Sequence, residues 1–318
     1  MPKNQKKIVT IGGGTGTFVM LSGLRDYPLN ISAIVSMADN GGSTGILREE
    51  IGVLPPGDVR RALVALSSQS QKILIDLFNY RFNEGTFNGH SFGNIFLAAL
   101  EKITGNTQKA IDEASKMLDV KGKIFPSTLT KCHLFAQLEN GKIIKGETNI
   151  DIPKHNTNTP IKRVWLKPRA KANPQAIKAI QNADFIILGP GDLYTSIIPN
   201  LLCSGIKNAL IKSKAKKIYI VNLMTKFGET NNFKASDFVK TIEKYTTKNL
   251  LDFIIINNKM PTKKRLEKYR EEKAQLVEID EENFPKTAQI IKTDLLRPRG
   301  FIRHDPNKLA KTIFQIVF

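Results

Sequence analysis

Residues 12–17 have the composition of a loop that binds an anion through its backbone. They follow the apolar run 8–11 and precede the apolar stretch 18–24, an order typical of a strand, a tight turn and a helix. Glycine permits such a turn and brings N–H groups close to a ligand, and the helix N-terminus adds about half a positive charge. The residues predicted to bind ligand here are Gly12, Gly13, Gly14, Thr15, Gly16 and Thr17.

Two common phosphate-binding motifs do not match this loop. A P-loop needs lysine and then serine or threonine after its last glycine, but Thr17 and Phe18 stand there instead. A dinucleotide-binding fingerprint that begins at Gly12 needs glycine at position 17, which is threonine. Ordinary P-loop chemistry is therefore not expected. A nucleotide site of another design is our interpretation, and glycines that only allow a tight turn are the alternative.

A second polar loop, residues 38–45, follows the apolar run 31–37. Its carboxylate, Asp39, stands where dinucleotide-binding proteins have the acidic residue that binds a ribose, at the end of the second strand. The predicted ligand contacts are Asp39, Asn40, Gly41, Gly42 and Ser43. Two such loops at neighbouring strand ends favour a ligand site, because ligands of open α/β sheets bind at the carboxyl ends of the strands.

The second half of the chain adds two more polar turns. Residues 189–196 follow the apolar strand 185–188, and residues 222–225 end the next predicted strand. Helix N-termini there could bind an anion, or the turns could be ordinary helix caps. Four polar turns indicate one crevice lined by both halves of the chain, to which these turns contribute Gly189, Gly191, Asp192, Tyr194, Thr195, Ser196, Asn222 and Thr225.

Three further polar residues stand next to predicted helices. Asp58 follows a Pro-Pro-Gly turn and could cap a helix that runs through Leu66. His90 could contact a phosphate, act as an acid or only cap a helix, and Asn94 could contact the ligand.

Between these motifs, strand and helix signals alternate, which predicts the α/β class. The expected helices include 72–81, 92–103, 107–118, 194–202, 206–212, 235–245, 263–273 and 305–318; the expected strands include 184–188, 218–223, 253–257 and 289–292. Strands 132–138 and 143–147 should form a hairpin through Asn140-Gly141. We therefore expect a single domain over 1–318, with a core of 1–120 and 172–318 and a hairpin and polar excursion at 121–171.

Composition excludes several classes of protein. The 318 residues are 41% hydrophobic, which is enough for a large core, and the two cysteines have no metal-binding spacing. The longest apolar stretch, 185–202, is interrupted by Asp192 and two prolines, so no membrane span is expected. These features favour a reduced cytoplasmic protein. The net charge is +19, but the lysines are scattered and no stacking aromatics interleave them, so nucleic acid is not the expected ligand.

Six ordered motifs resemble the CofD-like superfamily, specifically its gluconeogenesis factor (YvcK-type) branch. They cover residues 12–17, 38–48, 54–60, 89–94, 188–200 and 222–229, and the ending 303–306 also matches. The resemblance implies a Rossmann-like three-layer sandwich with a mostly parallel sheet. It also implies binding of uridine-diphosphate (UDP) sugars and a role in cell shape and envelope synthesis during gluconeogenic growth. It adds Tyr269 and Arg303 as ligand contacts. Without the resemblance, Tyr269 could equally be a residue of a charged helix, and Arg303 could equally be an ordinary surface cation.

The second loop departs from the family pattern at Asn40, and also at Thr44 and Ile46, where the family usually has serine and arginine. The second loop usually reads Asp-Asp-Gly-Gly-Ser, and here Asn40 replaces the second aspartate. Asparagine can be neither a base nor an anionic metal ligand. The change weakens the alternative of a CofD-type 2-phospho-L-lactate transferase, which acts on a guanosine diphosphate adduct and a deazaflavin. Whether the protein is an enzyme stays open.

The implied partners follow from the favoured hypothesis. No metal held by the protein alone is expected, although Mg²⁺ could accompany a bound diphosphate. A regulator of this kind would bind a UDP-sugar or a related nucleotide and engage a protein partner in envelope synthesis, and it could form a homo-oligomer. A nucleic-acid-binding protein driven by the net charge is the third hypothesis.

Overall fold

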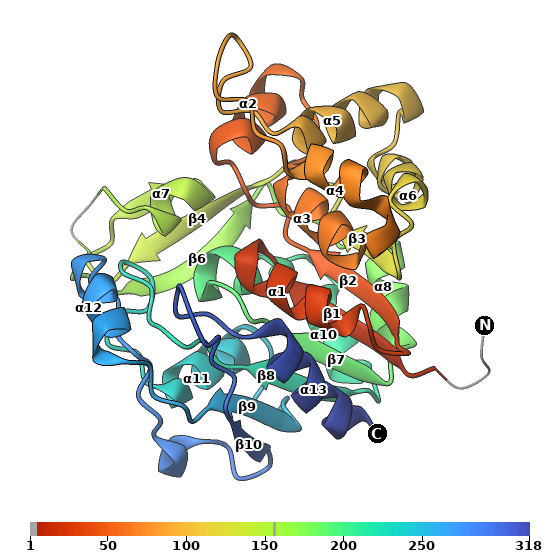
Figure 1. Cartoon of the computed structure of the whole chain (residues 1–318). Helices are drawn as coiled ribbons and strands as arrows, with labels where there is room; N and C mark the ends of the chain where they lie inside the picture. The colour runs from red at the N-terminus through yellow and green to blue at the C-terminus, as the bar shows by residue number, and fades with distance from the viewer. Residues whose placement is uncertain (1–4, 155–156) are drawn as a thin grey trace.

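The computed structural model describes residues 5–154 and 157–318. Its centre is a parallel seven-stranded sheet in the order β10-β9-β8-β7-β1-β2-β3, flanked by helices (Figure 1). The strands are β1 Lys7–Gly12, β2 Asn30–Val35, β3 Lys123–Pro126, β7 Phe185–Leu188, β8 Lys216–Ile220, β9 Phe253–Asn257 and β10 Gln289–Thr293. The predicted α/β class and mostly parallel sheet are confirmed.

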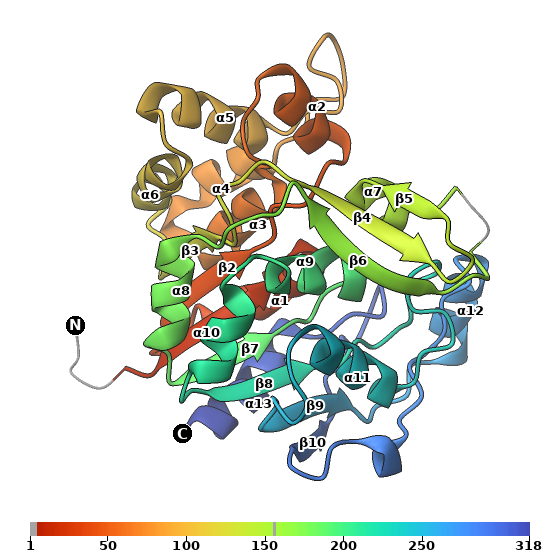
Figure 2. The ribbon, with the colours of Figure 1, turned by 180° about the vertical axis from the view of Figure 1, so that it is seen from behind.

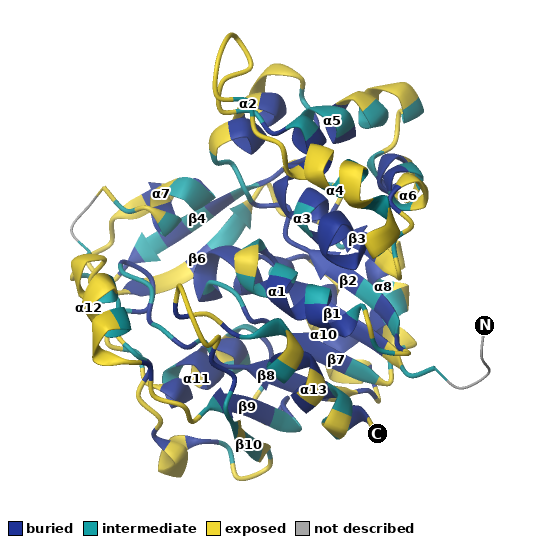
Figure 3. Ribbon diagram, viewed as in Figure 1, coloured by how far each residue is buried: buried dark blue, intermediate teal, exposed yellow. Residues whose placement is uncertain are grey.

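The central strands are apolar on both faces because helices cover both sides of the sheet. In β1, Ile8 packs in one hydrophobic cluster and Val9 in the other, as the alternation of side chains along a strand requires. The buried colouring of Figure 3 follows these strands through the middle of the molecule. The result is the expected three-layer sandwich.

Two sets of helices form the outer layers. One cluster joins the sheet to α1 Gly14–Leu24, α3 Gly57–Leu66, α6 Thr107–Met117 and α13 Pro306–Val317. The other joins it to α8 Pro174–Gln181, α9 Ile198–Leu201, α10 Ile206–Lys212 and α11 Ala235–Tyr245, which Figure 2 shows from behind. Helices α2 Gly42–Glu50, α4 Lys72–Asn79 and α5 Phe92–Thr104 extend the first half beyond the sheet (Figure 1).

A small antiparallel sheet in the order β5-β4-β6 leaves the main sheet. Strands β4 His133–Leu138 and β5 Ile143–Lys145 form the predicted hairpin, and α7 Glu147–Asp151 follows it. The third strand, β6 Ile161–Lys167, lies in the stretch interpreted as polar and irregular, and its exposed positions are mostly charged.

Several elements differ from the sequence interpretation. Strand β3 belongs to the main sheet, so the excursion begins after Pro126 rather than at residue 121. The helices α2, α7 and α8 were not predicted, and Glu147 begins α7 rather than ending the second strand of the hairpin. The expected helix 194–202 is a π-helical turn, Leu193–Ile197, that continues into α9. The remaining elements are α12 Lys263–Glu271 and the short 3-10 turns Gln69–Gln71 and Glu281–Asn283.

Candidate ligand-binding site

A cavity of about 1040 Å³ lies at the carboxyl ends of β1, β2, β7 and β8. The chain runs outward from β1 through β2 to β3 in one direction, and from β7 to β10 in the other. The order in which the chain adds strands therefore reverses between β1 and β7. Ligands of open α/β proteins bind at such a switch point. The volume is in the range of cavities that hold small molecules and cofactors.

All four predicted polar turns reach this cavity, as do the residues suggested by the family resemblance. The residues of the sequence prediction that line it are Gly14, Thr15, Gly16, Asp39, Gly41, Gly42, Ser43, Asp58, Asn94, Gly191, Asp192, Thr195, Ser196, Asn222, Thr225, Tyr269 and Arg303. The predicted crevice between the two halves exists, while the binding roles of these residues stay predictions.

Seven predicted residues do not line the cavity: Gly12, Gly13, Thr17, Asn40, His90, Gly189 and Tyr194. Several of them hold the loops together. The Thr17 hydroxyl donates to the Pro190 carbonyl at 3.3 Å, and a Cβ on Gly13 would lie 2.5 Å from Asp58 Oδ2. Thr17 thus joins the loops after β1 and β7, and the absence of a side chain at Gly13 leaves room for Asp58 of α3.

Asn40 and His90 also serve the frame of the site. The Asn40 side-chain oxygen accepts from the backbone N–H of Thr148 at 3.0 Å and from its hydroxyl at 3.2 Å. The Asn40 amide thus ties the second loop to α7. His90 Nδ1 lies 3.2 Å from the hydroxyl of Ser43, a cavity residue. The histidine therefore contacts a residue of the wall.

Asp58 joins α3 to the first glycine loop rather than capping its own helix. Pro56 is the N-cap of α3, and Asp58 accepts the Gly14 N–H at 2.9 Å. Burial raises the pKa of Asp58 to about 6; the charge of Arg61, 3.4 Å away, opposes this rise and that of Asp39 adds to it. One N–H of the glycine loop is thus already bound to a carboxylate of the protein.

Asp39 and Glu147 bring two more carboxyl groups to the same region. Asp39 Oδ1 accepts the Gly41 N–H at 2.9 Å, which orders the second loop. Glu147, from α7, was not predicted as a site residue. Burial raises its pKa to about 8, and the charges of Asp39, Asp151 and Asp58 add to the rise. A bound cation or donor group would therefore be stabilised here.

Three arginines line the same side of the cavity: Arg60, Arg61 and Arg81. Arg60 is buried and donates to the side-chain oxygen of Asn94 at 3.0 Å, which orients that amide. Burial and, less strongly, the charges of neighbouring arginines lower the pKa of Arg60 to about 10, against the opposing charges of nearby aspartates. The sequence analysis did not select these arginines, although Arg60 and Arg61 stand only two and three residues after Asp58.

A second charged network joins the loops after β7 and β8. The carboxylates of Asp151, Asp192 and Glu229 offer oxygens within 4.8 Å of one another. Lys226 Nζ lies 3.0 Å from Asp151, and Glu229 accepts from the Tyr194 N–H at 3.0 Å and the Thr195 hydroxyl at 2.9 Å. Burial raises the pKa of Glu229 well above its ordinary value. The Lys226 ammonium and two hydrogen-bond donors already bind these carboxylates, so the cluster forms an ion-pair network.

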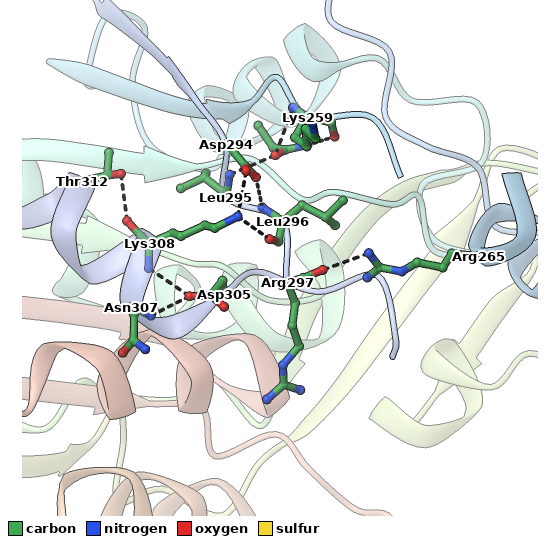
Figure 4. Close-up of polar contacts among 11 residues, drawn as sticks. Lys259, Arg265, Asp294, Leu295, Leu296, Arg297, Asp305, Asn307, Lys308 and Thr312 are labelled. Carbon is green, nitrogen blue, oxygen red and sulfur yellow. Dashed lines mark hydrogen bonds and ion pairs between the residues drawn. The ribbon is translucent and has the colours of Figure 1, made fainter. Parts of the chain in front are cut away.

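The segment between β10 and α13 carries Arg303 and His304 to the cavity, and α12 and α13 hold it in place. Arg265 donates to the carbonyls of Arg297, Gly300 and Phe301 at 2.8–3.0 Å. Lys308 bonds Asp294 at 2.7 Å and the Leu296 carbonyl at 3.0 Å (Figure 4).

Tyr269, one turn after Arg265 on α12, also supports this segment. Its hydroxyl accepts the Ile302 N–H at 2.9 Å. Tyr269 therefore lines the cavity and at the same time positions the chain next to Arg303. The Arg303 guanidinium lies 5.0 Å from the centroid of the Phe301 ring.

The fold and the cavity define a doubly wound α/β protein whose candidate site lies at the switch point of its sheet, the architecture of many nucleotide-binding proteins. The model of the family described as 2-phospho-L-lactate transferase CofD matches residues 8–296. The chain belongs to this family.

Curated relatives share almost the full length of the chain. A Bacillus subtilis protein named gluconeogenesis factor is 41% identical over 98% of this chain and 98% of its own length. A Listeria innocua protein of the same name is 38% identical over 100% and 98%. A crystal structure of a Bacillus halodurans protein has a TM-score of 0.93 and 39% identity, covering 98% of this chain and 100% of that one. These findings agree with the family resemblance seen in the motifs.

Proposed function

We propose that this protein binds a UDP-sugar and acts as a gluconeogenesis factor, a cytoplasmic regulator needed for cell shape and envelope synthesis under gluconeogenic growth. The observation that carries the proposal is the single cavity that joins all four strand-end loops. The name gluconeogenesis factor, borne by the relatives from Bacillus subtilis and Listeria innocua, supports the biological role.

The chemistry of the cavity agrees with a nucleotide ligand. The N-terminus of α2, at Gly42, and the side chains of Arg61 and Arg81 supply donors for a diphosphate. Asp39 supplies an acceptor for a hydroxyl group. A ligand that combines a diphosphate with hydroxyl-bearing rings uses both kinds of group.

A CofD-type transferase is the second candidate, and the family description favours it. In that reaction a carboxylate near the second loop would serve as a base or hold Mg²⁺. Asn40 cannot take either role, and its oxygen is already bound to Thr148. A binding protein without this reaction therefore agrees better with the second loop.

Mg²⁺ could enter with the diphosphate, with Asp39, Asp58 and Glu147 as the carboxyl groups that would hold it. The raised pKa values of Asp58 and Glu147 fit such a place, since a bound cation favours their charged forms.

A protein partner in envelope synthesis and a homo-oligomeric state are further parts of the proposal. No helix among the described residues is long and apolar enough to cross a membrane.

A thermal-shift comparison tests the ligand. A UDP-sugar at about 100 times its dissociation constant should stabilise the fold by about 2.7 kcal/mol and raise the melting temperature by several degrees. GDP, NAD and a deazaflavin with a guanosine diphosphate adduct are the comparison ligands. Equal or larger shifts with GDP or NAD, and none with UDP-sugars, would contradict the proposal, and turnover of the adduct would establish the transferase.

A further inference from the structure

Helix α4 carries apolar side chains on both of its sides. Leu74 and Ile75 pack against the core, and Phe78 is buried in it. Ile73 and Leu77 lie on the outer side of the helix, where they are 72% and 38% exposed. Figure 3 shows the exposed colouring of α4. A helix that is apolar all round is normally covered all round, so the outer side of α4 has the character of a contact surface.

This apolar surface continues beyond the C-terminus of α4. Tyr80 stands seven residues after Ile73, at helical spacing, and is 51% exposed. Phe87, in the loop that follows, is 54% exposed, and both rings pack against Phe82 at centroid distances of 5.1 and 5.4 Å. We call Ile73, Leu77, Tyr80 and Phe87 the α4 surface. Contiguous exposed apolar side chains of this kind mark a site of contact with another protein.

The charges on α4 are arranged in a self-complementary way. Lys72 and Asp76 are exposed and stand four residues apart, as Ile73 and Leu77 do beside them. Within residues 5–154 and 157–318, neither charge forms a salt bridge. When a twofold axis relates two antiparallel helices, one flank of a helix faces the same flank of the other in reverse order. Lys72 would then face Asp76 of a second copy, while Ile73 packs against its Leu77.

The size of α4 shows how much surface such a contact needs. The eight residues of the helix span about 12 Å. A specific interface usually buries about 800 Å² on each partner, which is more than this helix offers by itself. Tyr80 and Phe87 must therefore take part. Residues 83–89 are all exposed and supply further surface around Phe87.

We propose that two copies of this chain associate through the α4 surface, with their α4 helices antiparallel across a twofold axis. Ile73 and Leu77 form the apolar centre of the contact, and two pairs of Lys72 with Asp76 lie at its edge. This inference rests on the homo-oligomeric state in the proposed function and names the surface that forms it. It is independent of the nucleotide, because these four residues do not line the cavity.

Sedimentation velocity of the full chain over a series of protein concentrations tests the apolar centre. The wild type should form a dimer, and Ile73→Glu should weaken the association at least about tenfold, because the change buries an unpaired charge twice in a symmetric dimer. Ile211→Glu is the matched control, since Ile211 is 43% exposed on α10, which packs on the other face of the sheet. The control should associate like the wild type.

Charge reversal tests the antiparallel arrangement. Lys72→Asp and Asp76→Lys each place like charges opposite one another at two points of the dimer, and each should weaken the association several-fold. The double variant Lys72→Asp/Asp76→Lys restores both pairs and should associate like the wild type. A double variant that associates no better than the single variants overturns the proposal.

The remaining outcomes separate this inference from the ligand proposal. A wild type that stays monomeric at every concentration overturns the inference, and so does a dimer that Ile73→Glu leaves intact. If Ile73→Glu unfolds, the charge-reversal series decides, since its positions lie at the exposed edge of the contact. Titration with a UDP-sugar is run beside these measurements. A monomer that binds it refutes only the dimer, whereas a dimer that binds no nucleotide refutes the proposed ligand.

Discussion

At the scale of single residues, several polar side chains of the candidate site already form hydrogen bonds within the protein. Asp58 holds the first glycine loop through Gly14, and Asn40 holds α7 through Thr148. Asp39 differs, because within residues 5–154 and 157–318 its carboxylate accepts a hydrogen bond only at Oδ1, from the Gly41 N–H. Its other oxygen is free to accept from a ligand hydroxyl.

Asp39→Ala should therefore weaken nucleotide binding at least tenfold, because a hydrogen bond to a charged group is typically worth about 1.5–3 kcal/mol. Titration calorimetry measures the affinity, and thermal unfolding shows whether the fold survives. Asp76→Ala, on the exposed face of α4, is the matched control. Wild-type affinity in a folded Asp39→Ala protein would show that Asp39 is only a turn residue.

The raised pKa of Glu147, about 8, predicts a pH dependence of the free energy of unfolding. Its folded-state pKa lies above the ordinary 4.5, so the folded state binds more protons between about pH 4.5 and 8. The contribution of Glu147 is therefore fully present below that window and is lost as the pH rises through it. In the ligand-free protein, Glu147→Gln should raise the melting temperature at pH 8.5 relative to the wild type and change it little at pH 4.5. A constant difference across the window would contradict this account.

At the scale of elements, α12 acts on the site through the backbone of the segment between β10 and α13. Arg265 contacts three carbonyls of this segment and Tyr269 contacts the Ile302 N–H, yet Arg265 itself does not line the cavity. The helix therefore positions Arg303 and His304.

Arg265→Ala should weaken nucleotide binding several-fold, because each hydrogen bond it removes contributes about 1 kcal/mol to the order of the segment. Hydrogen exchange at the Ile302 amide should accelerate, while the core strands keep their protection. Lys268→Ala, exposed on the same helix, should leave both measurements unchanged. If Arg265→Ala weakened binding without faster exchange at Ile302, a direct electrostatic effect would explain the loss instead.

At the scale of the whole molecule, the first and last helices close the fold. Gly23 of α1 lies against the backbone of Pro306 in α13. A Cβ atom at Gly23 would lie 3.0 Å from Ala310 Cβ of the same helix. Helix α13 also packs on the same side of the sheet as α1. Helices α1 and α13, far apart in the sequence, thus share one core, and the single domain expected from the sequence stays a prediction.

Gly23→Leu should separate these helices and cost about 1–3 kcal/mol of stability, as overpacking usually does. The thermal transition should move down by several degrees and remain a single cooperative step, because one domain unfolds as a unit. Lys311→Leu adds a comparable side chain at an exposed position of α13 and should change little. Two separate transitions in the wild type would contradict the single-domain interpretation.

The amino-acid sequence by itself determined the α/β class, the order of most elements and the four turns that meet at one edge of the sheet. The reason is local: glycines, apolar runs and the Asn140-Gly141 turn have preferences that act over a few residues, and parallel strands bring their carboxyl ends together. The helices α2, α7 and α8 and strand β6 were missed because their many polar and small residues leave only a weak hydrophobic periodicity.

Only the tertiary structure decided which polar groups are free. Spacing along the chain could not show that Asp58 is bound to Gly14, that Asn40 is bound to Thr148, or that Glu147 joins the cavity from α7. These contacts join residues 44 to 108 positions apart, and they depend on how whole elements pack. The orientation of the Asn222 amide arises in the same way, because its N–H donates to the Gly191 carbonyl on the loop after a different strand.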